Sequence, residues 1–218
     1  MLRGKCIIPL GIKRIVNAPI DSNCYIIYDK SQSEECIIID PGSEHNVVLI
    51  NFLAQNSLIP KFIILTHEHF DHCWGVNDLR ERYPKIRIIC STKCSETIQD
   101  PRATYSRYYC KPEFVIAPAD ILLEFVQWKV YWNNYQFFFS AAKGHSASGI
   151  YIFIENAVFT GDTLVKDMKT TTKFKTGSIP DLKLSLQNLS RYKGHGLMVY
   201  PGHGDSFDLD KCDLSEAF

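Results

Sequence analysis

The sequence of 218 residues lacks an excess of charge of either sign, since Lys+Arg and Asp+Glu number 24 each. Such a chain does not have the strongly basic balance that attracts nucleic acids or anionic membranes through bulk electrostatics. It also lacks any apolar run that approaches the ~20 residues of a membrane-spanning helix. We therefore expect neither a nucleic acid nor a membrane as the partner of this protein.

The N-terminal segment lacks the features of an export signal. Pro9 interrupts its short apolar stretch, and Lys13 and Arg14 follow where a signal peptide would carry small residues. The eight cysteines include no CxxC pair, and a chain of this length folds without disulfides. The sequence thus favours free thiols in a reducing cytoplasm, and Cys73 is interpreted as a small buried apolar residue.

The composition, 45% hydrophobic and 22% charged, fits one globular α/β domain over residues 1–218. No linker, low-complexity tract or repeat divides it. Runs of β-branched and aromatic residues predict strands over 24–28, 36–39, 61–66, 85–90, 128–132, 136–139 and 197–200. Apolar spacing predicts helices over about 43–56, 73–83, 91–99 and 181–192. The aromatic strands between 114 and 159 predict a second, largely antiparallel sheet.

The densest group of metal-binding side chains is the run Thr66-His67-Glu68-His69-Phe70-Asp71-His72. It holds three imidazoles and the Asp71 carboxylate within six residues, which is too many ligands for one ordinary single-metal site. His67 and His69 follow a strand at a spacing of two and can point into one metal. Asp71 and His72 lie further along the turn and can reach a second metal.

Three later segments each place one ligand-type residue beside a glycine, between a strand and a turn. These pairs are Gly144-His145, Gly161-Asp162 and Gly202-His203. The glycines let the backbone bend tightly, so that the side chain projects from the edge of a sheet. A single histidine is more often structural than a ligand, but five in ordered motifs reverse that expectation. His45 and His195 belong to no motif and are expected at the surface or in turns.

These motifs together resemble one known family. THEHFDHCWG at 66–75 resembles the THxHxDHxxG signature of the metallo-β-lactamase superfamily, and GHSASG, FTGDTL and PGHG resemble its later motifs in the same order. IIIDPG at 37–42 is similar to an early strand and turn of that family. The closest resemblance is to small glyoxalase II-like hydrolases. It implies a four-layer αββα sandwich of two mixed sheets flanked by helices.

The resemblance also implies roles for seven residues. It assigns His67, His69 and His145 to a first metal, Asp71, His72 and His203 to a second, and Asp162 to a bridging position. The implied cofactors are two divalent ions, with zinc as the first choice and iron or manganese as alternatives. Such a pair lowers the pKa of a bridging water and polarises a carbonyl oxygen. The implied enzyme is a hydrolase of a small-molecule thioester, lactone or related ester, in which Asp71 or a water protonates the leaving group.

Three alternatives stay open. A persulfide dioxygenase-like oxidoreductase would hold a single iron with His67, His145 and Asp162. A binding or assembly protein would keep the metals only as a scaffold, although the complete ligand set argues for chemistry. A nuclease similar to the tRNA-processing relatives is disfavoured by the neutral charge balance.

The substrate is less well defined by the sequence. Glyoxalase II binds glutathione with basic residues of a C-terminal helical domain, whereas few residues follow His203 here. The residues that could line a substrate mouth are Arg102, Tyr105, Arg107, Tyr108 and Tyr109, for which an ordinary packed loop is an equal alternative. Lys173 and Lys175 are interpreted as a solvated basic loop, Glu68 as solvated or structural, and Thr66 as a support for the loop through its hydroxyl.

Overall fold

The first of two six-stranded sheets holds the N-terminal strands in chain order. The computed structural model describes residues 10–124 and 128–218. The strands are β1 (Gly11–Val16), β2 (Asn23–Tyr28), β3 (Glu35–Ile39), β4 (Ile59–Ile64), β5 (Arg87–Ser91) and β6 (Ile121–Leu123). Pairing is antiparallel from β1 to β3 and parallel from β3 to β6. The sequence did not predict β1, because two adjacent charged residues, Lys13 and Arg14, interrupt its short apolar pattern.

The second sheet has the order β12-β11-β10-β9-β8-β7. Its strands are β7 (Trp128–Trp132), β8 (Tyr135–Ala141), β9 (Ile150–Ile154), β10 (Ala157–Gly161), β11 (Met198–Pro201) and β12 (Phe207–Asp208). All its pairs are antiparallel except β10 with β11. The prediction of a largely antiparallel second sheet is confirmed, although β6, within the predicted range, belongs to the first sheet.

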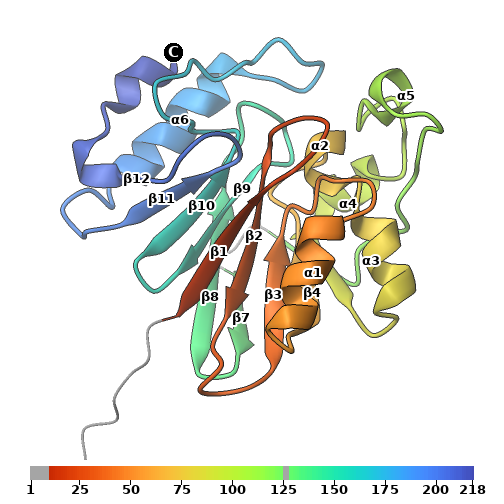
Figure 1. Cartoon of the computed structure of the whole chain (residues 1–218). Helices are drawn as coiled ribbons and strands as arrows, with labels where there is room; N and C mark the ends of the chain where they lie inside the picture. The colour runs from red at the N-terminus through yellow and green to blue at the C-terminus, as the bar shows by residue number, and fades with distance from the viewer. Residues whose placement is uncertain (1–9, 125–127) are drawn as a thin grey trace, which may run out of the picture.

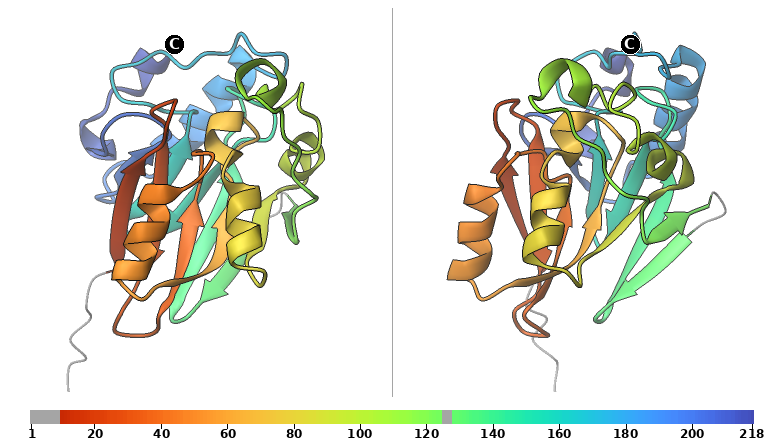
Figure 2. Two further views of the ribbon diagram at one scale, coloured as in Figure 1. Left: turned by 45° about the vertical axis from the view of Figure 1, so that its right-hand side comes forward. Right: turned by 90° about the vertical axis from the view of Figure 1, so that its right-hand side faces the viewer.

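Helices cover the outer face of each sheet, as Figures 1 and 2 show. On the first sheet, α1 (Val47–Gln55), α3 (Val76–Arg82) and α4 (Thr92–Thr97) enclose one apolar cluster. On the second sheet, α6 (Ile179–Ser190) encloses another. A third cluster, which contains Ile39, Phe137 and Phe159, fills the space between the sheets. The four-layer αββα sandwich of two mixed sheets is thereby confirmed.

Two predicted helices have different bounds in the structure. The helix expected over 73–83 is divided into α2 (Phe70–Cys73) and α3, because Gly75 lies against neighbouring chain. A Cβ there would be 2.3 Å from Asn46 Nδ2 and 2.4 Å from the Ser43 carbonyl oxygen. The helix expected from residue 43 begins after Asn46. A short helix, α5 (Ser106–Tyr109), lies within the segment expected to be a loop.

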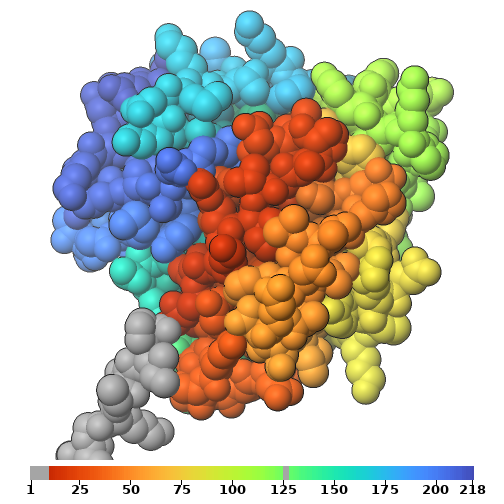
Figure 3. All heavy atoms as spheres, viewed as in Figure 1, coloured from red at the N-terminus to blue at the C-terminus, as the bar shows by residue number. Residues whose placement is uncertain are grey.

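Direct backbone hydrogen bonds join the two sheets at one end of the sandwich. The amide of Asn23 donates to the Gly202 carbonyl at 2.6 Å, and the amide of Ile150 donates to the Thr66 carbonyl at 3.0 Å. Figure 3 shows, at this end, the connection between β1 and β2 in red beside the cyan segment that follows β10. Within the described ranges, no helix combines the length and apolarity needed to cross a bilayer.

Candidate metal centre

The seven residues proposed as metal ligands lie together at this end of the sandwich. They come from five segments, namely the turn after β4 (His67, His69), α2 (Asp71, His72), and the turns after β8 (His145), β10 (Asp162) and β11 (His203). The sequence prediction placed Asp71 and His72 on a loop, whereas the structure places them on a short helix. Both side chains face candidate ligands that follow strands of the second sheet, since Asp71 Oδ2 lies 3.4 Å from His203 Nε2 and His72 Nε2 lies 3.3 Å from Asp162 Oδ1.

The first group consists of three imidazoles whose ring nitrogens face one another. His69 Nδ1 lies 3.2 Å from His67 Nε2 and 2.9 Å from His145 Nε2. All three side chains are buried. Three neutral imidazole nitrogens that converge on one point form a good site for a divalent transition metal.

The second group combines two imidazoles with a carboxylate. Asp71 Oδ2 lies 3.7 Å from His72 Nε2 and 3.4 Å from His203 Nε2. His203 is the more accessible of the two histidines, with 24% of its side chain exposed, while the His72 side chain is fully buried. This group therefore lies nearer to solvent on one side.

The Asp162 carboxylate lies between the two groups. Its Oδ2 is 3.5 Å from His145 Nε2 and 4.0 Å from His67 Nε2 in the first group. In the second group, Oδ1 is 3.3 Å from His72 Nε2, and Oδ2 is 3.5 Å from His203 Nε2. One carboxylate thus faces ring nitrogens of both groups.

Unpaired polar atoms test whether these residues fit metal ions. Buried polar atoms in folded proteins nearly always have a hydrogen-bond partner. Within the described residues, His69 Nε2, His72 Nε2 and Asp162 Oδ1 are buried and have none. Two of these atoms, His72 Nε2 and Asp162 Oδ1, lie at the convergence point, where metal coordination would satisfy them. The residues present therefore fit the pair of divalent ions.

Asp40 supports both groups, although the sequence analysis gave it no role. Its Oδ2 lies 3.0 Å from His72 Nδ1 and accepts a 2.5 Å hydrogen bond from the Thr66 hydroxyl. Its Oδ1 accepts from the Thr66 amide at 2.8 Å. A carboxylate oxygen of Asp40 also lies within 4.8 Å of nitrogens of His67 and His72, but because both oxygens have these partners, we interpret Asp40 as an orienting residue. The position of Asp40 in the sequence could have indicated this role. Asp40 directly follows β3, which is the parallel neighbour of β4.

Hydrogen bonds to the outer ring nitrogen orient His67 and His145. His67 Nδ1 lies 3.0 Å from the Thr66 hydroxyl, and since that hydroxyl donates to Asp40, we assign the proton to His67 Nδ1. His145 Nδ1 donates to the Thr171 carbonyl at 3.0 Å. These bonds turn the Nε2 atoms of His67 and His145 toward the site. The supporting role expected for the Thr66 hydroxyl agrees with this geometry.

Glu68 was predicted to be solvated or structural. The solvated alternative is wrong, because the side chain is buried. The residue is 2% exposed, and its Oε2 accepts a short hydrogen bond from the Ser148 hydroxyl. The Ser148 carbonyl in turn accepts from the Ser91 hydroxyl at 2.7 Å. Glu68 therefore has a structural role, because it ties the turn after β4 to the segment that carries His145. Cys73 is buried, and its thiol donates to the Glu68 carbonyl at 3.4 Å.

The two groups differ in their affinity for protons in the metal-free protein. Burial, with repulsion from His145 added, lowers the pKa of His69 to about 4. Burial also opposes protonation of His203, but hydrogen bonds to Asp162 and Asp71 outweigh it and raise the pKa of His203 to about 9. Burial by itself would raise the pKa of Asp162. The charge of His72 and the hydrogen bond with His203 outweigh burial and hold the pKa of Asp162 well below its usual value. At neutral pH His69 is therefore neutral, whereas His203 is an imidazolium paired with carboxylates.

One glycine is required by close packing at the centre. A Cβ on Gly202 would lie 2.0 Å from Asp162 Oδ1 and 2.9 Å from His72 Cε1. A side chain there would displace the carboxylate that lies between the groups. The glycines next to the ligands were expected to permit tight turns, and at Gly202 the requirement is close approach.

A cavity of ≈ 260 Å³ opens beside the metal centre. Its walls include ligands of both groups together with Ile20, Phe70, Tyr105, Tyr109, Thr171 and Phe174. Of the residues predicted to line a substrate mouth, Tyr105 and Tyr109 do so, whereas Arg102, Arg107 and Tyr108 are not part of the lining. Lys173 and Lys175 are exposed, as predicted.

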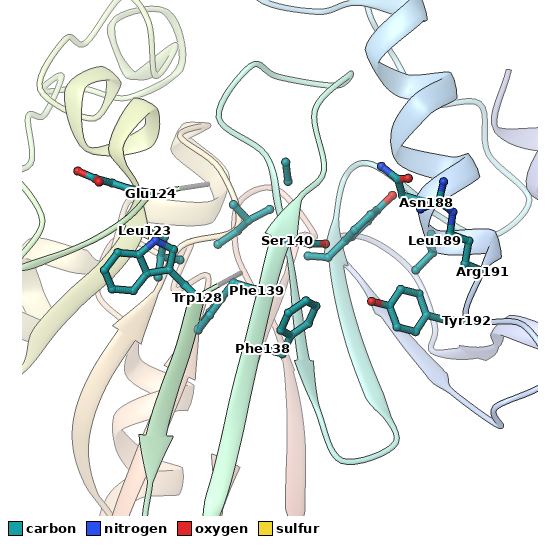
Figure 4. A pocket seen from close by; sticks show the side chains of 13 residues that line it. Leu123, Glu124, Trp128, Phe138, Phe139, Ser140, Asn188, Leu189, Arg191 and Tyr192 are labelled. Carbon is teal, nitrogen blue, oxygen red and sulfur yellow. The ribbon is translucent and has the colours of Figure 1, made fainter. Parts of the chain in front are cut away.

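A second cavity, of ≈ 340 Å³, lies away from the metal centre between β7, β8 and the end of α6. Figure 4 shows Trp128 and Phe138 on its strand side and Asn188, Arg191 and Tyr192 on its helix side. None of the seven candidate ligands lines it. His45 and His195 belong to none of the candidate metal-binding groups, and both are exposed, as predicted.

Comparison with known proteins agrees with this arrangement. The profile of the Metallo-beta-lactamase superfamily matches residues 18–203. The probable metallo-hydrolase YqgX of Bacillus subtilis is 25% identical over 199 residues, which cover 90% of this chain and 92% of that protein. The crystal structure of the BLEG-1 B3 metallo-beta-lactamase superposes with a TM-score of 0.82 at 28% identity and covers 94% of this chain and 95% of that one.

Similarity to hydroxyacylglutathione hydrolases is higher in identity but limited in extent. Hydroxyacylglutathione hydrolase 1 of Vibrio vulnificus is 46% identical over 70 residues. That match covers 32% of this chain and 26% of the relative. The chain thus matches only about a quarter of the length of this relative.

Proposed function

Because the chain belongs to the metallo-β-lactamase superfamily, we propose that it is a binuclear metal-dependent hydrolase of a small-molecule thioester, lactone or related ester. His67, His69 and His145 would hold one ion, Asp71, His72 and His203 the other, and Asp162 would bridge them. Zinc is the first choice of metal, because imidazole and carboxylate ligands suit it, with iron and manganese as alternatives. When bound, the pair supplies a water of lowered pKa and a Lewis acid for the carbonyl oxygen.

The position of Asp162 is the observation that carries this proposal. Its two oxygens lie 3.3 Å from His72 Nε2 and 3.5 Å from His145 Nε2, and these nitrogens belong to different groups. A carboxylate in that position would neutralise part of the charge of both ions and hold them close together. Asp40 and Thr171 keep the flanking imidazoles turned toward it.

Asp71 is the residue proposed to handle the leaving group's proton. It lines the cavity, so its carboxylate is accessible to a bound small molecule. Its Oδ2 lies 3.4 Å from His203 Nε2, which offers a path for a proton. A thiolate leaving group requires little such help, because thiols have a pKa of about 8.5.

The persulfide dioxygenase-like alternative needs only His67, His145 and Asp162. The second group weighs against it, because a mononuclear iron enzyme has no use for Asp71, His72 and His203 arranged around a further ion. Seven free thiols among the described residues agree with a reducing compartment, for which we propose the cytoplasm.

Elemental analysis combined with an activity panel tests the proposal. The full chain, purified without added metal, is expected to contain about two divalent ions and to hydrolyse members of a panel of thioesters, lactones and phosphodiesters. One iron per chain, with oxygen uptake on glutathione persulfide, would sink the hydrolase proposal. Metal-loaded protein that is inert toward the whole panel would instead support a scaffold role.

A further inference from the structure

The cavity beside the metal centre has apolar and aromatic walls. Apart from the metal-binding candidates, its lining consists of Ile20, Phe70, Tyr105, Tyr109, Thr171 and Phe174. We propose that this cavity selects an uncharged acyl substrate whose aliphatic or aromatic group packs against Tyr105 and Phe174. The inference rests on the proposed hydrolase function and adds to it the substrate class.

Phe174 and Tyr105 lie directly against the first group of imidazoles. The Phe174 ring is 4.6 Å from the His69 ring and 5.3 Å from the His145 ring, between centroids. The Tyr105 ring is 5.3 Å from the His69 ring and 5.0 Å from the Phe174 ring. A group held by these two rings would therefore lie beside the reacting carbonyl and not at a remote subsite.

The two aromatic walls come from different segments and are joined. Tyr105 has a φ of 66°, which turns its side chain from the start of α5 toward the segment after β10. Its hydroxyl accepts a hydrogen bond from the Lys175 amide at 3.3 Å, next to Phe174. The Phe70 ring on α2 and the Tyr109 ring on α5 stack at 4.8 Å with an interplanar angle of 5°. The rings thus form a defined apolar surface for a ligand group.

Among residues 10–124 and 128–218, no lysine or arginine lines this cavity. Buried carboxylates require a paired cation, and glutathione carries two carboxylates. The nearby cations lie outside the cavity, since Lys173 and Lys175 are exposed and Arg107 lies 3.7 Å from Glu113. The carboxylates of Asp71 and Asp162 also face the cavity. Because those two carboxylates would be paired with the proposed ions, it is the lack of lysine and arginine in the lining that disfavours a further anionic group away from the ions.

The volume of the cavity sets a limit on size. A cavity of ≈ 260 Å³ lies near the lower end of the ~300–1,000 Å³ range of small-molecule sites. Such a space suits one short acyl chain or one aromatic ring. A tripeptide conjugate would extend well beyond it.

Neutral thioesters of different chain length provide the test. Zinc-loaded full-length protein is assayed with acetyl and hexanoyl thioesters of N-acetylcysteamine and with S-lactoylglutathione. We expect kcat/KM for the hexanoyl ester to exceed that for the acetyl ester about 10-fold or more, since each methylene in an apolar pocket contributes strongly to discrimination. The Phe174→Ala variant is expected to reduce this ratio about 10-fold. Tyr131→Ala, at a site on β7 that is 71% exposed, is the matched control and should keep the wild-type ratio.

A binding measurement separates failure of this inference from failure of the proposed function. In NMR titrations, hexanamide should bind the zinc-loaded protein about 10-fold more tightly than acetamide, and Phe174→Ala should remove most of that difference. This result without any thioester hydrolysis would support the cavity's selectivity while it contradicts the hydrolase proposal. Hydrolysis with no chain-length preference, a preference for S-lactoylglutathione, or an unchanged ratio in Phe174→Ala would overturn the inference.

Discussion

The candidate metal centre and the aromatic cavity share one end of the sandwich. Their side chains differ in burial and in the hydrogen bonds that hold them. His67, His72 and His145 are at most 4% exposed, whereas Tyr109 and Ile20 in the cavity lining are 64% and 37% exposed. Each of these three imidazoles has a hydrogen-bond partner at its outer nitrogen. Tyr109, in contrast, is held by ring stacking on Phe70. The difference teaches that the buried, hydrogen-bonded side chains are suited to position the proposed chemistry, while the exposed lining is suited to select the substrate.

Removal of one ligand is expected to have the largest effect on the metal centre. His145→Ala should empty the first site and lower kcat/KM about 1,000-fold or more, because the Lewis acid and the activated water are lost together. Metal content by elemental analysis and hydrolysis of the best panel substrate measure the change. His195→Ala is the control, because His195 is exposed and outside the centre. Retained activity in His145→Ala would mean that the ligand assignment is wrong.

The support by Asp40 is expected to have an intermediate effect. Asp40→Asn keeps a residue type that tolerates the φ of 52° at this position. It removes the charge that orients His72 and, through Thr66, His67, so metal affinity should fall about 10- to 100-fold. Competition with a zinc chelator measures the affinity. Glu35→Gln, which breaks an exposed ion pair with Lys61, should leave the affinity unchanged, and equal affinities in the two variants would refute the orienting role.

Acid is expected to destabilise the metal-free protein through the first group. His69 has a pKa of about 4 in the folded chain and about 6.5 when unfolded. Because the folded pKa is depressed, the unfolded state binds more protons between pH 6.5 and 4, and stability falls as the pH falls through this window. At pH 5 the loss from His69 amounts to about 2 kcal/mol.

Denaturant unfolding of the metal-free chain at pH 7.5 and pH 5 measures this loss. His203 offsets part of this loss, since its raised pKa of about 9 makes its stabilisation complete only below pH 6.5 and already partly lost at pH 7.5. A His69→Gln variant, which keeps the His203 contribution, should therefore lose less stability than the wild type between the two pH values, or gain stability. An identical change in both proteins would show that His69 is not the acid-sensitive group.

The smallest effect is expected from the exposed wall of the cavity. Tyr109→Ala removes a ring that is 64% exposed and stacks on Phe70. The free energy of unfolding should change by about 1 kcal/mol or less, and metal content should stay at the wild-type level. Thermal unfolding and elemental analysis check both values. Loss of metal from this variant would show that the two regions are not independent.

Several structural features followed from the sequence because they depend on local patterns. The β-branched runs of β3, β4 and β5 specify buried parallel strands, and the ligand motifs occur where strands end. The structure brings together all seven residues assigned through the family resemblance. The break between α2 and α3 did not follow from the sequence, because it depends on how closely Gly75 approaches Asn46 and Ser43.

What the sequence determined by itself is the kind of chemistry, because ligand identity and spacing are properties of the chain. Only the tertiary structure decided how the ligands are held and what lies beside them. Asp40 orients His72, which is 32 positions away in the sequence. Tyr105 contacts Phe174, which comes from another segment, at the wall of the cavity. Such contacts arise from the packing of parallel strands and loops in space. The periodicity of the sequence does not predict them.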